Sequence, residues 1–217
     1  MLDWQRIDSV FLDMDGTLLD LYFDNYFWRQ YVPQRYAEAR GMGLDAAHAD
    51  LSRRYQRHLG TLQWYCVDFW SAELQLDIAA LKHEVQHLIA VHPHVPAFLQ
   101  AARAAGKRVT LVTNAHHKSL TLKMQRTGLD VHFDALITSH QIGLAKEHPA
   151  FWGKLQAVEA FDPARTVLVD DSLPVLRSAQ AYGIAQLVAV HQPDTRDARK
   201  DVEEFQGIDS FLQIMPG

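Results

Sequence analysis

The sequence predicts an α/β fold, a doubly wound parallel sheet that carries a helical insertion directly after its first strand. Two patterns lead to this fold class. Strand-sized apolar segments alternate with helix-sized segments over most of the chain, and residues 20–91 contain no convincing strand. Composition agrees with it. Of the 217 residues, 48% are apolar and 22% are charged, so the chain can bury a sizeable core and is not disordered.

Five segments are predicted to be buried parallel strands, because they are short, nearly continuously apolar and end at polar residues. They are Ile7–Leu12, Lys107–Val112, Asp134–Thr138, Arg165–Val169 and Ala185–Val190. Four helices are predicted between them, at Val95–Ala105, Lys118–Thr127, Phe151–Glu159 and Pro174–Tyr182. Three of these helical segments are followed directly by glycine, a common C-terminal stop. The alternation predicts right-handed crossovers that cover both faces of the sheet.

The stretch 20–91 is rich in aromatic residues, and its apolar residues recur at helical spacing. Examples are the triplets Phe23, Phe27, Tyr31 and Leu74, Ile78, Leu81. We therefore predict two domains, a core formed by residues 1–19 and 92–217 and a helical domain formed by residues 20–91.

The C-terminal region is predicted to have two parts. Residues Gln192–Glu204 are charged, and we expect them to be exposed to solvent. Phe211, Leu212 and Ile214 are apolar, and we expect them to pack back onto the core.

Charge and composition exclude several kinds of partner. The chain has 21 Lys and Arg against 26 Asp and Glu, a net charge of −5, which argues against a nucleic-acid polymer as ligand. Apolar runs are far shorter than the roughly 20 residues of a spanning helix, and the first residues do not resemble a signal peptide. The single cysteine, Cys66, can form no internal disulfide. We expect a soluble cytoplasmic protein with no membrane partner; a monomer is compatible, although the sequence does not fix the oligomeric state.

Polar residues follow four of the predicted strands, at the edge where parallel sheets bind ligands. They are Asp13 with Asp15, Thr113 with Asn114, Lys146, and Asp170 with Asp171. Four carboxylates in one crevice repel one another unless a cation intervenes, and oxygen ligands suit Mg²⁺, which commonly binds carboxylates together with phosphate. Lys146 adds a positive charge and Thr113 and Asn114 add neutral donors. This chemistry predicts a site for a phosphate group.

These residues also carry a resemblance to a known family. Val10–Leu18, with its sequence VFLDMDGTL, resembles the first motif of the haloacid dehalogenase-like (HAD) phosphatase superfamily. Val112–Asn114 resembles the second motif, Lys146 the third and Leu168–Asp171 the fourth. One departure is Glu147, which follows Lys146 where many members have proline, and it affects the loop more than the chemistry. The resemblance implies a Rossmann-like core and a helical cap at residues 20–91 that closes over the site.

The resemblance further implies a mechanism through an aspartyl-phosphate. Asp13 would be the nucleophile, and Asp15 would protonate the leaving oxygen and later deprotonate water. Mg²⁺ would be held by Asp13, the backbone carbonyl of Asp15 and Asp171, with Asp170 acting directly or through water. Thr113 and Lys146 would hold the transferring phosphoryl group.

A narrower resemblance covers most of the chain. Segments similar to the bacterial GMP/IMP (purine) 5′-nucleotidase subfamily are Leu18–Leu21, Phe23–Trp28, Leu62–Cys66, Thr113–His116 and Thr127–Asp130. This implies a small phosphorylated metabolite, a purine nucleoside 5′-monophosphate, as substrate. Asn25, Trp28 and Tyr65 in the cap are our predicted contacts to base or ribose, since aromatic faces stack on bases. In the core, the predicted substrate-binding residues are Thr113, Asn114, His116 and Lys146.

Three rival functions stay open. A dehalogenase would use Asp13 on carbon, although Asp15 argues against it, because carbon displacement has no phosphate leaving oxygen to protonate. A HAD phosphatase or phosphomutase acting on sugar phosphates would use the same motif residues. A catalytically idle binding protein would use the cap aromatics as a docking surface.

The 12 histidines raise a zinc alternative. His83–His87 matches the pattern His-Glu-x-x-His, which can place two imidazoles on one helical face for zinc. A zinc peptidase would leave the carboxylates and Lys146 unexplained. We therefore predict an amphipathic cap helix with Leu81, Val85 and Leu88 facing inward and with His83 and His87 in solvent.

Overall fold

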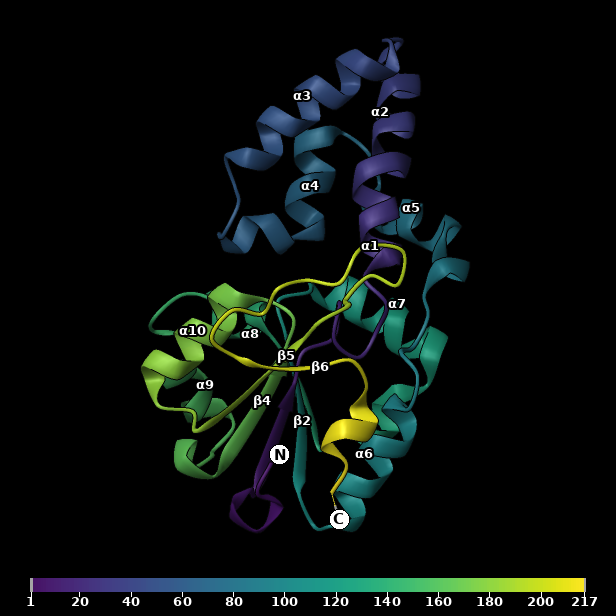
Figure 1. Ribbon diagram of the computed structural model, residues 1–217. Coiled ribbons are helices and arrows are strands. Elements are labelled where there is room, and N and C mark those ends of the chain that lie inside the picture. Colours follow the sequence, from purple (N-terminus) through teal and green to yellow (C-terminus); the bar gives the residue numbers. More distant parts are fainter. Residues whose placement is uncertain (1, 217) are drawn as a thin grey trace.

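In the computed structural model, which describes residues 2–216, six parallel strands form one sheet in the order β3-β2-β1-β4-β5-β6 (Figure 1). The strands are β1 (Ser9–Leu12), β2 (Arg108–Thr113), β3 (Ala135–Thr138), β4 (Thr166–Asp170), β5 (Gln186–Val190) and β6 (Gln206–Ile208). The predicted α/β fold with a parallel sheet is confirmed, and all five predicted strands are present. The sequence analysis missed β6, which has only three residues and contains a glycine.

The strand register brings the carboxyl ends of the central strands to one edge. Leu12, the last residue of β1, is paired with Leu111 of β2 and with Val169 of β4. Thr113 of β2 is paired in turn with Thr138 of β3. The polar residues that follow these strands therefore emerge side by side, as expected for a parallel sheet.

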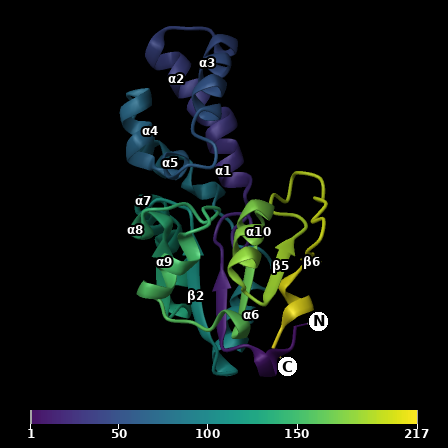
Figure 2. The same cartoon turned by 90° about the vertical axis from the view of Figure 1, so that its left-hand side faces the viewer.

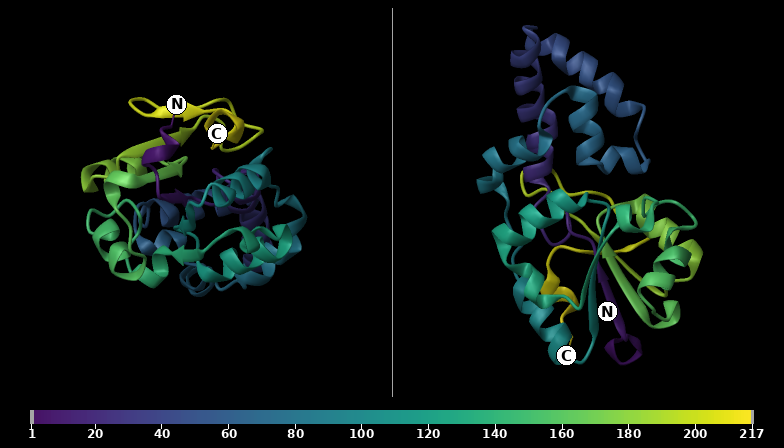
Figure 3. Two further views of the ribbon diagram at one scale, coloured as in Figure 1. Left: turned by 90° about the horizontal axis from the view of Figure 1, so that it is seen from below. Right: turned by 180° about the vertical axis from the view of Figure 1, so that it is seen from behind.

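Alternate residues of each strand pack on opposite faces of the sheet, and both faces are buried. Val10 and Leu12 join a core with helices α6 (Val95–Ala104) and α7 (His117–Thr127). Phe11 joins a second core with α8 (Ser139–Ile142), α9 (Phe151–Val158) and α10 (Leu173–Tyr182). The view from below shows helices on both sides of the sheet (Figure 3). Burial on both faces explains why the strands are almost continuously apolar.

The four predicted core helices are all present, with ends within one residue of those expected. Gly128 and Gly183 follow α7 and α10 with φ of 67° and 105°, the left-handed backbone that favours glycine. Short 3-10 turns complete the core; they are η1 (Trp4–Arg6), η5 (Leu129–His132), η6 (Pro163–Arg165) and η7 (Phe211–Ile214).

The segment between β1 and β2 is helical and stands at the end of the sheet where the central strands end (Figures 1 and 2). Its elements are α1 (Tyr22–Tyr26), the π-helical η2 (Phe27–Tyr31), α2 (Val32–Arg40), α3 (Leu44–Gln56), η3 (Leu62–Tyr65), α4 (Val67–Leu74), α5 (Ile78–Glu84) and η4 (Gln86–Leu88). The spacing of Leu74, Ile78 and Leu81 does not mark one helix. Gln75, with φ of 53°, ends α4 before α5 begins, although the side chains of Leu74, Ile78 and Leu81 are all buried.

The chain enters and leaves this helical insertion at one place. Leu19 forms an antiparallel bridge with Val91, and the backbone N–H of Asp20 donates to the carbonyl of Ala90 at 2.9 Å. The N–H of His92 donates to the carbonyl of Leu18, also at 2.9 Å. We propose that the two domains meet here, as residues 1–19 and 92–217 and residues 20–91, because the two connecting segments support each other.

The expectation for the C-terminal region is partly wrong. Within the charged segment 192–204, Asp194 is 5% exposed, because its carboxylate accepts a hydrogen bond from Asn25 at 2.7 Å. Figure 1 shows this yellow-green segment passing beside α1 at the base of the insertion. Further on, Phe211 and Ile214 are buried as expected, whereas Leu212 is 54% exposed. Leu212 lies on the outer side of the short turn η7.

Over residues 2–216, the structure contains no helix of the length and hydrophobicity that a membrane crossing requires.

Candidate active site

One cavity of about 510 Å³ lies between the helical insertion and the carboxyl ends of the strands. All eleven predicted site residues line it, namely Asp13, Asp15, Asn25, Trp28, Tyr65, Thr113, Asn114, His116, Lys146, Asp170 and Asp171. The core residues come from the ends of β1, β2 and β4 and from the loop after α8, and the others come from the insertion. The topology thus brings together residues that are far apart in the sequence.

Lys146 lies at the centre of the buried charges and is 1% exposed. Its Nζ is 2.5 Å from Oδ1 of Asp13 and 2.7 Å from Oδ2 of Asp170, and it donates to the carbonyl of Val112 at 2.9 Å. Burial alone would lower the pKa of Lys146, but the two carboxylates outweigh burial and raise it. The ammonium group is therefore charged at neutral pH.

Asp13, Asp170 and Asp171 form an acidic cluster, with one oxygen of each within 4.8 Å of the others. Burial raises the pKa of Asp13 and of Asp171 to about 6, and it also raises the pKa of Asp170. Oxygen donors held this close repel one another, a donor set that suits a hard divalent cation. These three residues therefore fit the metal that the sequence motifs imply.

Gly16 allows the acidic cluster to be this compact. It has φ of 88°, and a Cβ at this position would lie 2.8 Å from Cγ of Asp171. Any other residue would strain the backbone and push Asp171 away. Oδ2 of Asp171 also lies 3.2 Å from Nζ of Lys200.

Asp15 belongs to a second network that the sequence analysis missed. Nζ of Lys123, from α7, lies 2.6 Å from Oδ1 of Asp15 and 2.5 Å from Oδ2 of Asp24. Lys82, from α5, lies 2.9 Å from Oδ1 of Asp24. Burial raises the pKa of Asp15 to about 6. For Asp24, the two ammonium groups outweigh burial and hold its pKa well below its usual value. No sequence pattern marked these lysines, because both occur within ordinary helical segments.

Glu147 joins the insertion to the core beside the cavity. The hydroxyl of Tyr65 donates to Oε1 of Glu147, and Nδ2 of Asn114 donates to Oε2, both at 2.9 Å. The amide oxygen of Asn114 accepts from the backbone N–H of Lys146, also at 2.9 Å. Asn114 thereby fixes the loop that presents Lys146. The departure from the motif at Glu147 provides a polar contact that a proline could not make.

The part of the cavity formed by the insertion has an aromatic wall. The ring of Trp28 lies 5.9 Å from that of Tyr55 and 6.1 Å from that of Trp70, and both pairs meet edge to face. Trp64 also contributes to the cavity wall. A wall of this kind offers π-faces next to a charged site.

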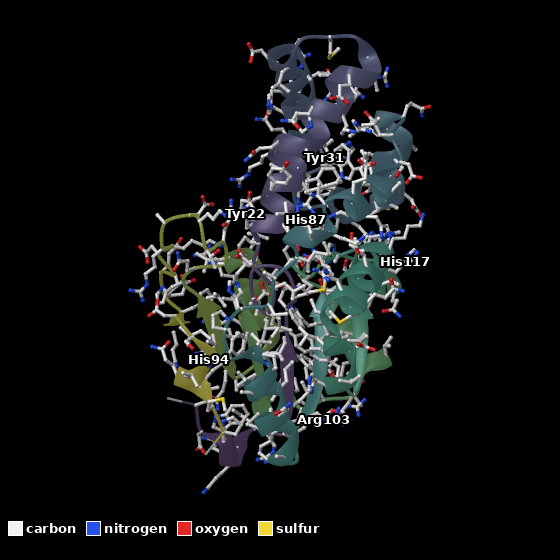
Figure 4. All side chains as sticks on the ribbon, turned by 90° about the vertical axis from the view of Figure 1, so that its right-hand side faces the viewer. Tyr22, Tyr31, His87, His94, Arg103 and His117 are labelled. Carbon is white, nitrogen blue, oxygen red and sulfur yellow. The ribbon has the colours of Figure 1, made fainter. Side chains whose placement is uncertain are left out.

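The His-Glu-x-x-His pattern is not on one helical face. His83 lies on α5, which ends at Glu84, and His87 lies on the separate turn η4. Both histidines are exposed and Leu81 and Val85 are buried, as predicted, whereas Leu88 is only partly buried. Figure 4 shows His87 at the base of the insertion. The two imidazoles are thus placed differently from those of a zinc-binding helix.

The fold and the acidic site define the class of this protein. A family model described as haloacid dehalogenase-like hydrolase matches residues 7–183. The chain belongs to this family and is a hydrolase.

Sequence similarity is also high over the full length. GMP/IMP nucleotidase YrfG of Escherichia coli (strain K12) is 37% identical over 213 residues, which cover 98% of this chain and 96% of that protein. The resemblance to the purine nucleotidase subfamily is confirmed.

Solved structures share the fold at lower identity. A HAD phosphatase from Thermococcus onnurineus superposes with a TM-score of 0.77 at 22% identity and covers 96% of both chains. L-2-haloacid dehalogenase from Xanthobacter autotrophicus superposes with a TM-score of 0.59 at 19% identity, over 85% of this chain and 78% of that one. Because phosphatases and dehalogenases share this fold, the reaction has to be argued from the site.

Proposed function

We propose that this hydrolase is a Mg²⁺-dependent phosphatase that cleaves purine nucleoside 5′-monophosphates, GMP and IMP, through an aspartyl-phosphate. The observation that carries the proposal is the position of Asp13, 2.5 Å from the buried Lys146 and beside Asp170 and Asp171 on one cavity. The similarity to a nucleotidase over 98% of the chain supports the substrate class.

In this proposal, a carboxylate oxygen of Asp13 attacks phosphorus, and the bond between phosphorus and the ribose 5′-oxygen breaks. Asp15 donates a proton to that leaving oxygen and then removes one from the water that attacks the phosphoaspartate. The raised pKa of Asp15, about 6, suits a group that must both give and take a proton near neutrality. Release of phosphate restores Asp13.

Positive charge is needed because both nucleophile and substrate are anionic. In this proposal Lys146 supplies one charge from a fixed position, and the hydroxyl of Thr113 donates to a phosphoryl oxygen. When Mg²⁺ is bound by Asp13, Asp171, the carbonyl of Asp15 and Asp170, it supplies further charge neutralisation. Carboxylates are the ligands that this ion prefers.

The cavity volume and its aromatic wall support a nucleotide as substrate. About 510 Å³ is a typical size for a small-molecule pocket. Trp28 and Tyr65 are our candidates for contact with the base, and Asn25 and His116 for contact with polar groups of base or ribose. Asn25 is held by Asp194, so its amide orientation is fixed.

The test is phosphate release from GMP, IMP, AMP and a panel of sugar phosphates with Mg²⁺ present. We expect kcat/KM to be highest for GMP and IMP. A clear preference for sugar phosphates, transfer of phosphate between sugar positions, or halide release from a haloacid would each replace this proposal by the corresponding rival. Complete inactivity on all compounds would favour a binding protein.

We propose that the protein is cytoplasmic, as expected from the sequence. The single thiol, Cys66, is free, as in proteins of reducing compartments. A small phosphorylated metabolite, and not a nucleic-acid polymer, is the proposed ligand. Cell fractionation with an antibody against the protein tests the location.

A further inference from the structure

A second group of metal-ligating side chains lies beside the cavity, apart from the acidic cluster. Cys66 follows η3 in the insertion, His116 precedes α7, and His140 lies on α8. One ligand atom of each, Sγ and two imidazole nitrogens, lies within 4.8 Å of the other two. Three separate elements from both parts of the molecule converge on this point.

The burial of these imidazoles is unusual. Both ring nitrogens of His140 expose less than 1 Å² each and have no hydrogen-bond partner. A neutral imidazole always keeps one N–H, so one donor and one acceptor are left unpaired at a cost of roughly 1–3 kcal/mol for each buried group. His116 is 4% exposed, and its ring lies 4.8 Å from that of His140. A bound ion would use the unpaired lone pair of His140. Binding through either nitrogen of His116 would give up the long, 3.4 Å hydrogen bond that its Nδ1 accepts from the backbone N–H of Lys118.

Burial also keeps these rings in the form that binds metals. It lowers the pKa of His116 to about 4, with a further contribution from His117, and it lowers the pKa of His140. His117 is exposed and stands at the end of α7 that faces the insertion (Figure 4). The buried imidazole of His116 and the half-buried one of His140 are thus neutral at neutral pH, as metal ligation requires.

The surroundings of the thiol also suit a ligand. Cys66 is the N-cap of α4, and its Sγ accepts a 3.4 Å hydrogen bond from the backbone N–H of Phe69. Asp68 is a further donor within reach, since its Oδ2 lies 3.7 Å from Nε2 of His116.

We propose that Cys66, His116 and His140 bind Zn²⁺, with Asp68 or a water molecule in the fourth position. One thiolate and two imidazoles are a donor set of borderline softness that selects zinc over magnesium. Tetrahedral Zn–S and Zn–N bonds of about 2.3 and 2.0–2.1 Å place ligand atoms less than about 4 Å apart. The three atoms here lie within 4.8 Å of one another, so small side-chain movements would close the site. The ion would join the insertion to the core, because Cys66 belongs to the insertion and both histidines belong to the core.

Zinc binding can be measured without reference to catalysis. Protein freed of metal is kept in excess Mg²⁺, so that the acidic cluster is filled, and is titrated with Zn²⁺ against a chromophoric chelator. We expect one equivalent of Zn²⁺ to bind, and Co²⁺ in its place to give the charge-transfer absorption of a thiolate ligand. Because Cys66 is the only cysteine, bound Zn²⁺ also slows alkylation of the whole thiol content.

The variants Cys66→Ala and His140→Gln should weaken Zn²⁺ binding by at least about 10–100-fold. In His140→Gln, Zn²⁺ should no longer protect the thiol from alkylation. His87→Gln, an exposed histidine outside the cluster, is the matched control and should bind Zn²⁺ like the wild type. Circular dichroism checks that each variant is folded, and His116→Gln replaces any variant that is not.

Two results would overturn the proposal. One is no Zn²⁺ bound at stoichiometric concentrations, with no thiolate absorption from Co²⁺. The other is unchanged Zn²⁺ affinity in both Cys66→Ala and a folded histidine variant, which would place the ion elsewhere. Neither result bears on the hydrolysis step, which rests on the acidic cluster and Lys146. Bound zinc would only take His116 out of contact with base or ribose.

Discussion

Lys146 is the single side chain on which the electrostatics of the acidic site most depend. Its ammonium group contacts two buried carboxylates, and a backbone carbonyl accepts its third hydrogen bond. A charge in this position offsets repulsion within the site before any cation binds. At the residue scale, we therefore expect Lys146 to contribute both to stability and to catalysis.

Replacing Lys146 by methionine should reduce both the activity and the stability of the protein. Loss of a fixed charge near the transferring group should lower kcat/KM by about 10²–10³-fold. Leaving Asp13 and Asp170 unpaired should lower the free energy of unfolding by about 3–5 kcal/mol in the absence of divalent ions. Lys154→Met, an exposed lysine of α9, is the control, and near wild-type turnover in Lys146→Met would contradict the assignment. Steady-state kinetics and urea unfolding measure the two effects.

Most individual site residues could be predicted from the sequence because they follow strand ends in short motifs. Asp13 and Asp170 are examples, since the register of parallel strands places them together. Asp24, Lys82 and Lys123 could not be predicted in this way. Their charges pair across three helices, and nothing in a helical pattern tells which lysine turns inward.

At the scale of elements, the ion network of Asp24 joins α1, α5 and α7, and so joins the insertion to the core. Asp24→Asn should lower the free energy of unfolding by about 3–5 kcal/mol at neutral pH, because buried Lys82 loses its carboxylate partner and Lys123 keeps only Asp15. The lysines lower the pKa of Asp24 below its ordinary value of 3.8, although burial acts in the opposite direction. The stability it contributes is present above 3.8 and is lost as pH falls through the lower, folded-state pKa.

The difference in stability between wild type and Asp24→Asn should therefore shrink below a pH of about 4. Urea unfolding at a series of pH values measures this difference. Asp45→Asn, an exposed carboxylate of α3, should show no such dependence. If the stability difference between the two proteins stays constant down to strongly acidic pH, the lysines do not stabilise the carboxylate form of Asp24.

A second contact between elements joins η3 to the loop after α8, through Tyr65 and Glu147. Tyr65→Phe should raise KM with little change in kcat, because it loosens the insertion without touching the reacting groups. A double-mutant cycle with Glu147→Gln should give a coupling energy of about 0.5–3 kcal/mol. Tyr182→Phe removes a hydroxyl that bonds Gln156 away from the cavity, and should leave KM unchanged. Additive effects of Tyr65→Phe and Glu147→Gln would show that the contact is absent in solution.

The insertion was predictable as helical but not in detail. The period of its apolar residues indicated helices but not where each helix ends. Gln75, in the left-handed conformation, separates α4 from α5 although the helical spacing of apolar residues continues across it. Strand β6 could not be predicted because the sequence shows no pattern for it. It has too few residues to show alternation, and its position depends on pairing with β5.

For the whole molecule, cation binding and folding should be linked through the acidic cluster. Mg²⁺ at a hundredfold excess over its Kd should raise the free energy of unfolding by about 2.7 kcal/mol, since the unfolded chain has no assembled site. Asp171→Asn should lose most of this gain. Asp209→Asn, an exposed carboxylate paired with Arg199, should keep it. Equal stabilisation of wild type and Asp171→Asn would place the cation outside the cluster.

The fold of the whole molecule followed from the sequence because alternating strands and helices allow few arrangements. The spatial grouping of the histidines could not be predicted from the sequence. The sequence pattern pointed to His83 and His87, which are exposed, whereas the structure places His116 and His140 beside Cys66. Only the three-dimensional arrangement brings residues 66, 116 and 140 together.

The most direct test of the central claim is to trap the phosphorylated enzyme. Protein turning over GMP with Mg²⁺ is treated with borohydride, which reduces an acyl phosphate to an alcohol, and peptides are analysed by mass spectrometry. We expect substrate-dependent reduction at residue 13, absent without GMP and absent in Asp13→Asn, which should be folded and inactive. Full hydrolysis with no reduction at residue 13, or turnover by Asp13→Asn, would contradict the aspartyl-phosphate account.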